Sequence, residues 1–356
     1  MQTLRRTLVV LLVLSLVAPT AMAVPVLATG ASSTGSHSAT GGAAQECALP
    51  VAVTDGTGAT VTVESTPQRV VAVGASAAQV LWELGVEDRV VGMDRAPYTA
   101  YLEGSAEKTG VLNDDGSVDQ ERVVALEPDL VIMANIHSNE TVETLRGAGL
   151  TVYKDDFPDS LAGIRSSVDT YGTLLGVCDR ADSVNAAFDE SLAAIEQRTA
   201  ARQNPDVLYY FYNFTAGSET FTDELIEAAG GTNVAARAGV EGYAQMNLEL
   251  VVQQDPQVVV VPEASPLPTG TPWNATTAFS DDAIVRVDTD LAQQPGPRVL
   301  TPIRTMETAF AEASAREPTA PTRPASAAQS VLAGGLVLVV VLAVGLAVGA
   351  ARIGRP

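Results

Sequence analysis

The apolar positions of the chain contain a repeat that joins a helical pattern to a strand pattern. Residues 119–132 and 247–260 align without a gap. Each copy holds a short amphipathic stretch, then a proline, then a continuous apolar run at Leu130–Met133 or Val258–Val261. Proline cannot continue a helix, and an unbroken apolar run is typical of a parallel strand that is covered on both faces. The repeat therefore predicts an α/β fold with two similar lobes, each built on a central parallel sheet.

Both copies of the repeat also begin alike. Asp119 and Asn247 have short side-chain oxygens that can accept a hydrogen bond from a first-turn N–H, which makes them good helix N-caps. Glu121 and Glu249 follow two residues later. A carboxylate in the first turn is stabilised by the helix dipole by about 0.3–1 kcal/mol. Capping alone is therefore one interpretation of the paired glutamates.

The remaining apolar periodicity predicts further elements around the repeat. Strands are expected at Val70–Val73, Val90–Val91, Leu150–Tyr153, Val207–Phe211 and Ile284–Val287. Helices are expected at Ala77–Leu84, Thr141–Arg146, Leu161–Leu175, Arg180–Arg202, Asp223–Ala229 and Val299–Ala313. The pattern of Arg180–Arg202 has one apolar face and contains no proline or glycine, so it predicts a long, straight helix.

The two ends of the chain differ in composition from the middle. Residues 1–23 combine a basic start, a short apolar run and a small-residue end, which is typical of a signal peptide read by the general or the twin-arginine export route. Val331–Ala351 has no charged residue and is long enough to span a bilayer. Arg352 and Arg355 follow it, and positive charge places such a tail in the cytoplasm. A buried core helix is the competing interpretation.

These patterns divide the chain into segments. The segments are a signal peptide at 1–23, a flexible spacer at 24–46, an N-terminal α/β lobe at 47–158, connecting helices at 159–204, a C-terminal α/β lobe at 205–313, a proline-containing linker at 314–329, a transmembrane helix at 330–351 and a cytoplasmic tail at 352–356. The sequence thus predicts extracellular lobes that are anchored at the cell surface by a C-terminal helix, which is either retained or processed.

The repeat resembles the cobalamin, haem and ferric-siderophore binding proteins of ABC importers, the periplasmic binding proteins with a helical backbone. Further stretches that carry this resemblance are Pro67–Val71 before Gly74–Ala78, Leu84–Gly85 before Val90–Gly92, Glu227–Asn233, and Pro297–Arg298. It covers roughly residues 48 to 312. The resemblance implies one stiff helix between the lobes, a monomer without catalytic turnover, and an ABC permease with its ATPase as partners.

The net charge changes the expected setting of the protein. The chain has 42 acidic and 21 basic residues, a net charge of −21, and its only lysines are Lys108 and Lys154. Such an acidic, lysine-poor exported chain resembles the proteins of extreme halophiles, where the Debye length falls to roughly 3 Å. The acidity therefore indicates a solvated surface, and it argues against nucleic acid as a partner.

Two kinds of covalent modification are expected. Cys47 and Cys178 are the only cysteines, so in an exported chain they predict a disulfide. A lipid anchor on Cys47 and two free thiols are the alternatives. Asn139, Asn213 and Asn274 each precede a threonine by two residues, and we expect at least one of these acceptor sites to carry a glycan.

Three other chemistries fit the sequence less well. His37 and His137 are the only histidines, which disfavours a bare transition-metal site. Ser76 lies in a glycine-containing turn similar to a nucleophile elbow, but the motif is incomplete and no histidine is placed as its base, so we interpret Ser76 as a helix N-cap. Asp155 and Asp156 are expected in a solvated turn. An adhesion module would explain an anchor and glycans, but not the repeat.

Aromatic residues gather where the predicted strands end, although they make up only 5% of the chain. The candidate ligand-binding aromatics are Tyr98, Tyr101, Phe211, Tyr212, Phe214, Tyr243 and Trp273. Parallel α/β lobes bind ligands at the carboxyl ends of their strands, and flat rings suit a conjugated macrocycle or chelate. Arg95 and Arg298 can meet ligand amides, carboxylates or catecholates. Packing between loop and lobe is the competing interpretation of each ring.

The resemblance adds roles for particular residues. Cobalamin binders can place an aromatic ring on the corrin where this chain has Tyr243, but the second aromatic that they can place is missing from residues 111–116. Ferric siderophores and haem therefore stay open as ligands, and a tyrosinate such as Tyr98 could ligate haem iron. The resemblance also implies that Glu121 and Glu249 dock onto arginines of the two permease subunits.

Overall fold

The computed structural model describes residues 47–95, 97–156 and 158–316. The predicted signal peptide, spacer, transmembrane helix and cytoplasmic tail, and most of the predicted linker, lie outside these residues. Within the described ranges, no helix has both the length and the apolar character needed to cross a bilayer.

The first parallel sheet lies in the N-terminal part of the fold. Its strands are β3 (Val70–Val73), β4 (Val90–Met93), β5 (Thr109–Gly110), β6 (Leu130–Met133) and β7 (Val152–Lys154), in the order β5-β4-β3-β6-β7. All of its strand pairs are parallel. The central strands β3 and β6 are fully buried, as their unbroken apolar runs predict. The chain leaves β3 toward β4 and returns on the other side as β6, so the sheet has a switch point between β3 and β6.

The second parallel sheet repeats this arrangement. Its strands are β8 (Asp206–Tyr209), β10 (Thr232–Asn233), β12 (Val258–Pro262) and β13 (Ile284–Val287), in the order β10-β8-β12-β13. These pairs are also parallel. The prediction of an α/β fold with two parallel sheets is thus confirmed.

Two antiparallel ribbons were not predicted. One pairs β1 (Val51–Thr54) with β2 (Thr60–Val63), and the other pairs β9 (Phe214–Ala216) with β11 (Tyr243–Gln245). Their strands are short and partly exposed, so they lack the continuous apolar run that marks the central strands.

The helices flank these sheets. They are α1 (Ala75–Glu83), α2 (Gln120–Ala125), α3 (Asn139–Gly147), α4 (Leu161–Leu175), α5 (Cys178–Thr199), α6 (Phe221–Ala228), α7 (Val234–Arg237), α8 (Leu248–Gln254), α9 (Thr277–Ser280), α10 (Thr289–Gln293) and α11 (Leu300–Ala315). Single 3₁₀ turns lie at Glu87–Arg89, Pro97–Thr99, Ser105–Glu107, Trp273–Ala275 and Pro297–Val299.

The caps of the repeat helices match the sequence prediction. Asp119 accepts a hydrogen bond from the Arg122 N–H at the start of α2, and Asn247 accepts one from the Glu249 N–H at the start of α8. The prediction for Ser76 is wrong, because α1 begins at Ala75 after Gly74, and Ser76 lies inside its first turn.

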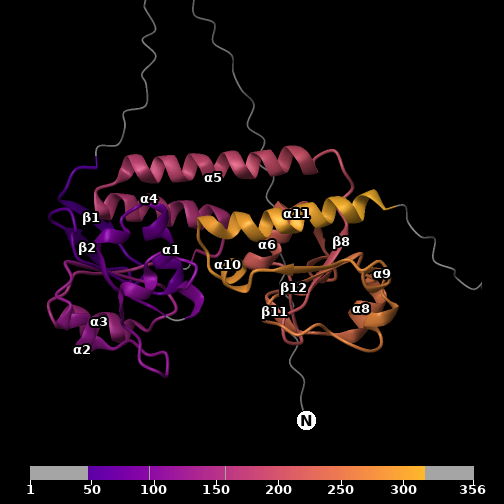
Figure 1. Ribbon diagram of the computed structural model, residues 1–356, viewed down its shortest axis with the longest axis horizontal. Coiled ribbons are helices and arrows are strands. Elements are labelled where there is room, and N and C mark those ends of the chain that lie inside the picture. The colour runs from indigo at the N-terminus through magenta and orange to yellow at the C-terminus, as the bar shows by residue number, and fades with distance from the viewer. Residues whose placement is uncertain (1–46, 96, 157, 317–356) are drawn as a thin grey trace, which may run out of the picture. The chain divides into compact units, whose positions relative to one another are not determined.

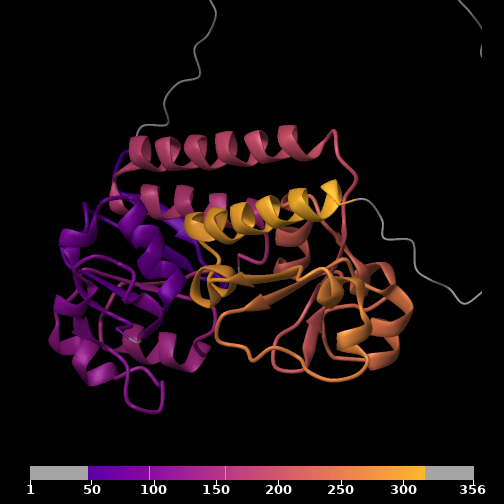
Figure 2. The same cartoon turned by 45° about the vertical axis from the view of Figure 1, so that its right-hand side comes forward.

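A layer of helices connects the two sheets (Figures 1 and 2). The long helix α5 packs against both α4 and α11, which lie on the same side of it, toward the sheets (Figure 1). Glu307 on α11 accepts from the Arg198 guanidinium at 3.3 Å, and the backbone carbonyl of Glu307 accepts from Arg202 at 3.1 Å. The predicted single helix is thus one member of a layer of three, because α4 and α11 both bury apolar faces against it.

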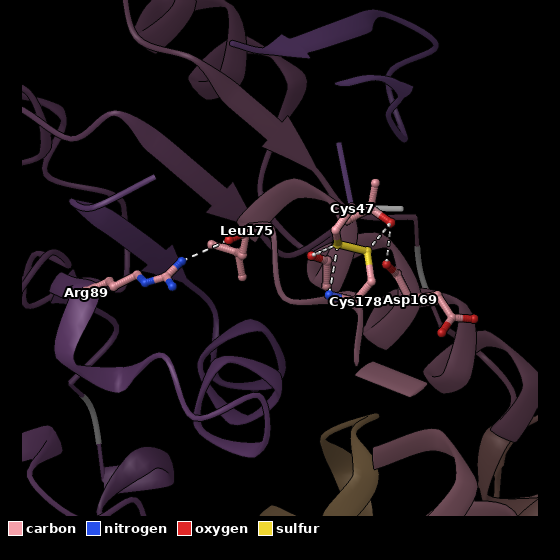
Figure 3. The surroundings of a disulfide bond; sticks show 7 residues. Cys47, Arg89, Asp169, Leu175 and Cys178 are labelled. Atoms are coloured by element: carbon pink, nitrogen blue, oxygen red, sulfur yellow. Dashed lines mark hydrogen bonds between the residues drawn. A yellow bond between two sulfur atoms is a disulfide. The ribbon is translucent and has the colours of Figure 1, made fainter. Parts of the chain in front are cut away.

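The predicted disulfide is confirmed. Cys47 is bonded to Cys178, the first residue of α5, and their Cα atoms are 5.7 Å apart (Figure 3). The Arg89 guanidinium donates to the Leu175 carbonyl at 2.9 Å, at the end of α4. The bond ties the start of the described chain to the junction of α4 and α5, and it leaves Cys47 no free thiol for a lipid.

Candidate functional site

A cavity of about 120 Å³ lies where the carboxyl ends of the first sheet meet the second half of the fold. The residues that line it are Ala75, Ser76, Ala134, Asn135, Ile136, Asp155, Pro158, Gln293, Gln294 and Pro295. These follow β3, β6 and β7 on one side and α10 on the other. The cavity therefore lies at the switch point of the first sheet, where ligands bind in open α/β sheets. We call it the interlobe cavity.

Glycine is required at the edge of this cavity. Gly74 has a φ of +112°, a left-handed conformation that L side chains rarely adopt, and a Cβ there would lie 2.4 Å from the Cβ of Ala134. The strand β3 can thus turn directly into α1 while the loop after β6 passes close beside it. This close passage brings Ser76 and Asn135 to the same cavity.

The β9–β11 ribbon presents an aromatic face. Tyr243 pairs with Ala216, and Gln245 pairs with Phe214, so Phe214 and Tyr243 lie on one face of the ribbon. Their side chains are 47% and 62% exposed. The Tyr243 hydroxyl lies 3.0 Å from the Thr222 hydroxyl, which holds the ring at its outer edge. We call this pair the aromatic face.

Three other predicted rings lie near strand ends. Tyr98 and Tyr212 are half exposed. The Tyr212 hydroxyl donates to the Ala264 carbonyl, and Phe211 packs edge-on against the Tyr212 ring with centroids 4.8 Å apart. Phe211 itself is half-buried against the core of the second sheet. Tyr98 and Tyr212 thus present aromatic surface to solvent, whereas Phe211 packs between the Tyr212 ring and the core.

Trp273 departs from the prediction. It is 4% exposed and packs edge-to-face against Tyr210, with centroids 5.4 Å apart. Its ring belongs to the same core cluster as Leu208 and Val259. The expectation that it lies on the ligand surface is wrong, because this large ring fills the space beside the second sheet.

Tyr101 and Arg298 join the two halves of the fold. The Gln79 side-chain amide donates to the Tyr101 hydroxyl at 2.8 Å, and this hydroxyl donates to the side-chain Oε1 of Gln294 at 2.8 Å. Arg298 lies over the Tyr101 ring at 5.3 Å and donates to Glu83 at 2.6 Å. Burial raises the pKa of Tyr101, so it stays a neutral donor. The structure therefore places both residues in a cross-lobe contact rather than on an open ligand surface.

Arg95 and Tyr98 are brought together in a second, larger cavity of about 960 Å³ within the first half of the fold. Its polar lining carries both charges, from Asp94, Arg95, Glu107, Lys108, Asp114, Asp115 and Arg122. The Arg95 guanidinium donates to the Ala106 carbonyl at 3.1 Å, which fixes it against the loop after β4. A lining with both charges is more typical of the polar edge of a binding site than of a surface that contacts an apolar ligand.

The side chain of Asp155 is buried, whereas the sequence predicted a solvated turn. It is 6% exposed rather than solvated. Its carboxylate accepts from the Tyr171 hydroxyl at 2.9 Å and from the Ser167 hydroxyl at 3.2 Å. No salt bridge reaches it from the described residues, since the neighbouring Lys154 ammonium donates to Asn139 instead. The one available signal was its position directly after the strand β7.

Burial of this carboxylate predicts a pH-dependent cost. Burial raises the pKa of Asp155 from 3.8 to about 6. The folded state therefore holds this proton more tightly than the unfolded chain. The contribution of Asp155 to the free energy of unfolding falls as the pH rises from about 4 to about 6, and it stays low above that. Two pKa units correspond to about 3 kcal/mol.

The substitution Asp155→Asn keeps an oxygen for the Tyr171 hydroxyl but removes the charge. We expect it to raise the free energy of unfolding by roughly 1–3 kcal/mol at about pH 8, and to change it little near pH 4.5. Denaturant unfolding at molar salt at both pH values measures this. Asp156→Asn, an exposed neighbour, is the matched control; its charge adds only a smaller part to the raised pKa of Asp155, so this variant should change the stability at pH 8 less than Asp155→Asn does. Equal stability of Asp155→Asn and wild type at pH 8 would contradict the assignment.

No group of three metal-ligating side chains occurs among the described residues. His137 follows β6, and burial lowers its pKa. Its Nε2 atom is buried and has no hydrogen-bond partner in the described part of the chain. An inaccessible nitrogen of this kind indicates a packing role.

The predicted surface residues lie at the surface. Glu121 on α2 and Glu249 on α8 are exposed, and so are the acceptor residues Asn139, Asn213 and Asn274. Asn139 already accepts from Lys154 at 2.7 Å. The glycan sites stay predictions.

Known proteins are similar to this chain in sequence and in fold. A family profile described as "Periplasmic binding protein" matches residues 70–292. A cobalamin-binding protein of Halobacterium salinarum is 37% identical over 279 residues, which cover 74% of this chain and 75% of that protein.

Two solved structures share the fold. A periplasmic haem-binding protein of Roseiflexus sp. RS-1 in apo form has a TM-score of 0.61 and 24% identity, over 70% of this chain and all of that one. A periplasmic vitamin B12 binding protein of Vibrio cholerae has a TM-score of 0.59 and 21% identity, over 70% and 99%. At these identities the likeness concerns the fold alone.

Proposed function

This chain belongs to the periplasmic binding protein family, and from that premise we propose that it is the substrate-binding component of an ABC importer that captures a corrinoid. A ferric siderophore or haem is the alternative ligand. Proteins of this family are transport components that do not turn over a substrate, so the site is interpreted as a binding surface and not as a catalytic centre.

The observation that carries the ligand proposal is the aromatic face. Phe214 and Tyr243 are large apolar rings that remain exposed on a short ribbon beside the carboxyl end of β8. Exposed aromatic surface of this kind is typical of a binding site. Offset stacking of an aromatic ring on a flat ring system contributes about 0.5–1.5 kcal/mol for each pair, in addition to the free energy of burying the apolar area. A corrin or a planar chelate can contact both rings at once, and Tyr98 and Tyr212 can contribute further edges.

The cobalamin-binding relative supports a corrinoid as the first choice. At 37% identity over three quarters of both chains, it is similar well beyond the fold. The likeness to haem-binding and vitamin B12 binding structures concerns the fold, which accommodates both ligands. The aromatic face suits all three ligand classes, so the choice among them rests on the binding experiment below.

We further propose that Glu121 and Glu249 dock onto the permease. They occupy equivalent positions in the two repeat helices and are both exposed. Val124 on α2 and Val252 on α8, three residues later in each copy, are exposed as well. Each copy thus presents a carboxylate beside an apolar side chain. A partner with two equivalent subunits, each with a basic and an apolar group, would match this repeat. The apolar contacts would persist at molar salt, where long-range steering is screened.

The anchor and the location are also part of the proposal. The apolar segment at 330–351 would hold the extracellular lobes at the membrane, the signal peptide at 1–23 would direct export, and at least one of the three acceptor asparagines would carry a glycan. An ABC permease and its ATPase would be the partners of a monomeric binding protein.

Ligand capture should change the arrangement of the lobes little. The layer of α4, α5 and α11, together with the Tyr101–Gln294 and Arg298–Glu83 contacts, ties the two sheets to each other. We expect the radius of gyration from solution scattering to change by less than about 0.5 Å on ligand binding. A hinge can close only where few fixed contacts join the two sides, and here several do. A contraction of several ångströms would contradict this prediction.

A binding titration tests the proposed function. The described part of the chain, residues 47–316, is titrated calorimetrically with cobalamin, haem and several ferric siderophores at molar salt. We expect saturable binding of cobalamin with one site per chain. The absence of binding to every one of these ligands would refute the receptor function and favour the adhesion module.

A further inference from the structure

The interlobe cavity has a chemical character that the aromatic face does not explain. Five of its ten lining residues are polar, namely Ser76, Asn135, Asp155, Gln293 and Gln294. None of these ten described residues is arginine, lysine or histidine. The cavity therefore offers hydroxyl, amide and carboxylate groups but no cationic side chain.

Its size suits one short arm of a ligand. The volume of about 120 Å³ corresponds to about four water molecules at roughly 30 Å³ each. A planar carboxamide or carboxylate on a short stem fits this volume, whereas a macrocycle does not. A macrocycle held on the aromatic face would thus reach the cavity only with a peripheral side chain.

Asp155 fixes which arm is tolerated. Its carboxylate is buried and held by Tyr171 and Ser167 from α4. It keeps its charge near neutral pH, because burial raises its pKa only to about 6. A ligand carboxylate brought into the cavity would meet a like charge at low dielectric with no cation beside it, which is strongly unfavourable. A primary amide is neutral and brings two N–H donors, for which the Asp155 carboxylate and the Asn135 side-chain oxygen are acceptors in the lining.

We propose that the interlobe cavity is a subsite for a neutral primary-amide arm of the ligand, and that Asp155 is the specificity-determining residue that excludes a carboxylate arm. This inference rests on the proposed function and narrows it. Corrinoids carry peripheral primary amides, whereas haem carries two propionates. The cavity therefore selects the corrinoid among flat ligands that the aromatic face alone would accept.

The experiment compares cobalamin with its monocarboxylates, in each of which one peripheral amide has been hydrolysed to a carboxylate. Binding is measured calorimetrically at molar salt and about pH 8 for wild type, Asp155→Asn and Asp156→Asn. Asp156 is exposed and does not line the cavity, so its substitution removes the same charge at nearly the same place in the sequence. Thermal unfolding confirms that each variant is folded.

We expect wild type to bind at least one monocarboxylate isomer more than tenfold more weakly than cobalamin. Asp155→Asn should bring that isomer to within about threefold of cobalamin, and Asp156→Asn should leave the ratio as in wild type. The inference is overturned if wild type binds every isomer as tightly as cobalamin, or if the ratio is unchanged in Asp155→Asn.

These outcomes separate the subsite from the proposed function. Tight binding of cobalamin without discrimination between amide and carboxylate would overturn the subsite and leave the importer function in place. Binding of haem in preference to cobalamin would do the same. Failure to bind any corrinoid or ferric chelate would instead refute the proposed function, and the subsite with it.

Discussion

Replacing Glu121 and Glu249 together by arginine is expected to abolish ligand uptake while ligand affinity stays within about twofold of wild type. Both side chains are exposed on α2 and α8, and neither lines the interlobe cavity. If each carboxylate meets a basic group of one permease subunit, the double reversal places like charges together at both contacts. Like-charge contacts cost several kcal/mol in total, which is enough to prevent productive docking.

Uptake of labelled ligand by cells that carry the variant as their only binding protein measures this effect. The matched control is Asp182→Arg with Glu190→Arg, which makes the same change of charge at exposed positions on α5. It should take up ligand normally. Normal uptake by the Glu121→Arg, Glu249→Arg protein, with the fold intact, would show that the two glutamates serve only the first turns of their helices.

Removing the aromatic face is expected to have the second-largest effect. The double substitution Phe214→Ala with Tyr243→Ala should weaken corrinoid binding by roughly 30–100-fold. Each ring contributes buried area as well as about 0.5–1.5 kcal/mol of stacking. Both side chains are exposed in the free protein, so the fold should lose little stability.

The conservative control keeps both rings. Phe214→Tyr with Tyr243→Phe exchanges the hydroxyl that lies beside Thr222 but retains the flat surfaces. Its affinity, measured by the same calorimetric titration, should stay within about threefold of wild type. An alanine variant that binds as tightly as wild type would remove the aromatic face from the ligand site and turn attention to the larger cavity beside Arg95 and Tyr98.

The sequence predicted those elements whose burial is decided locally. The central strands β3 and β6 were predicted with the bounds that they have. Continuous runs of β-branched and other apolar residues need cover on both faces, and few structures besides central parallel strands provide it. The helix α4 was also predicted with its bounds, because Gly176 ends it in a left-handed conformation that favours glycine. The cysteine pair followed from there being only two cysteines.

Part of the candidate site could be predicted in the same way. Tyr98, Tyr212, Phe214 and Tyr243 follow or flank apolar strands, and chains of this class bind at strand ends. Their exposure agrees with that prediction. The paired glutamates were found because the repeat itself is visible in the sequence. The signal for the aromatic residues lies within a few residues of each side chain, whereas the signal for the glutamates is the likeness of two segments that lie far apart in the sequence.

Some residues are surrounded by side chains from distant parts of the chain, and only the tertiary structure decided whether these residues are buried or exposed. Trp273 is buried by Tyr210 and the second sheet, and Tyr101 meets Gln294 across 193 residues of sequence. Asp155 is enclosed by α4 and by the approach of the second half of the fold, although its neighbour Asp156 is exposed. Local sequence sets which backbone conformation a segment prefers. Burial, charge state and access to a ligand depend on which remote side chains pack against it, and that is fixed only when the chain has folded.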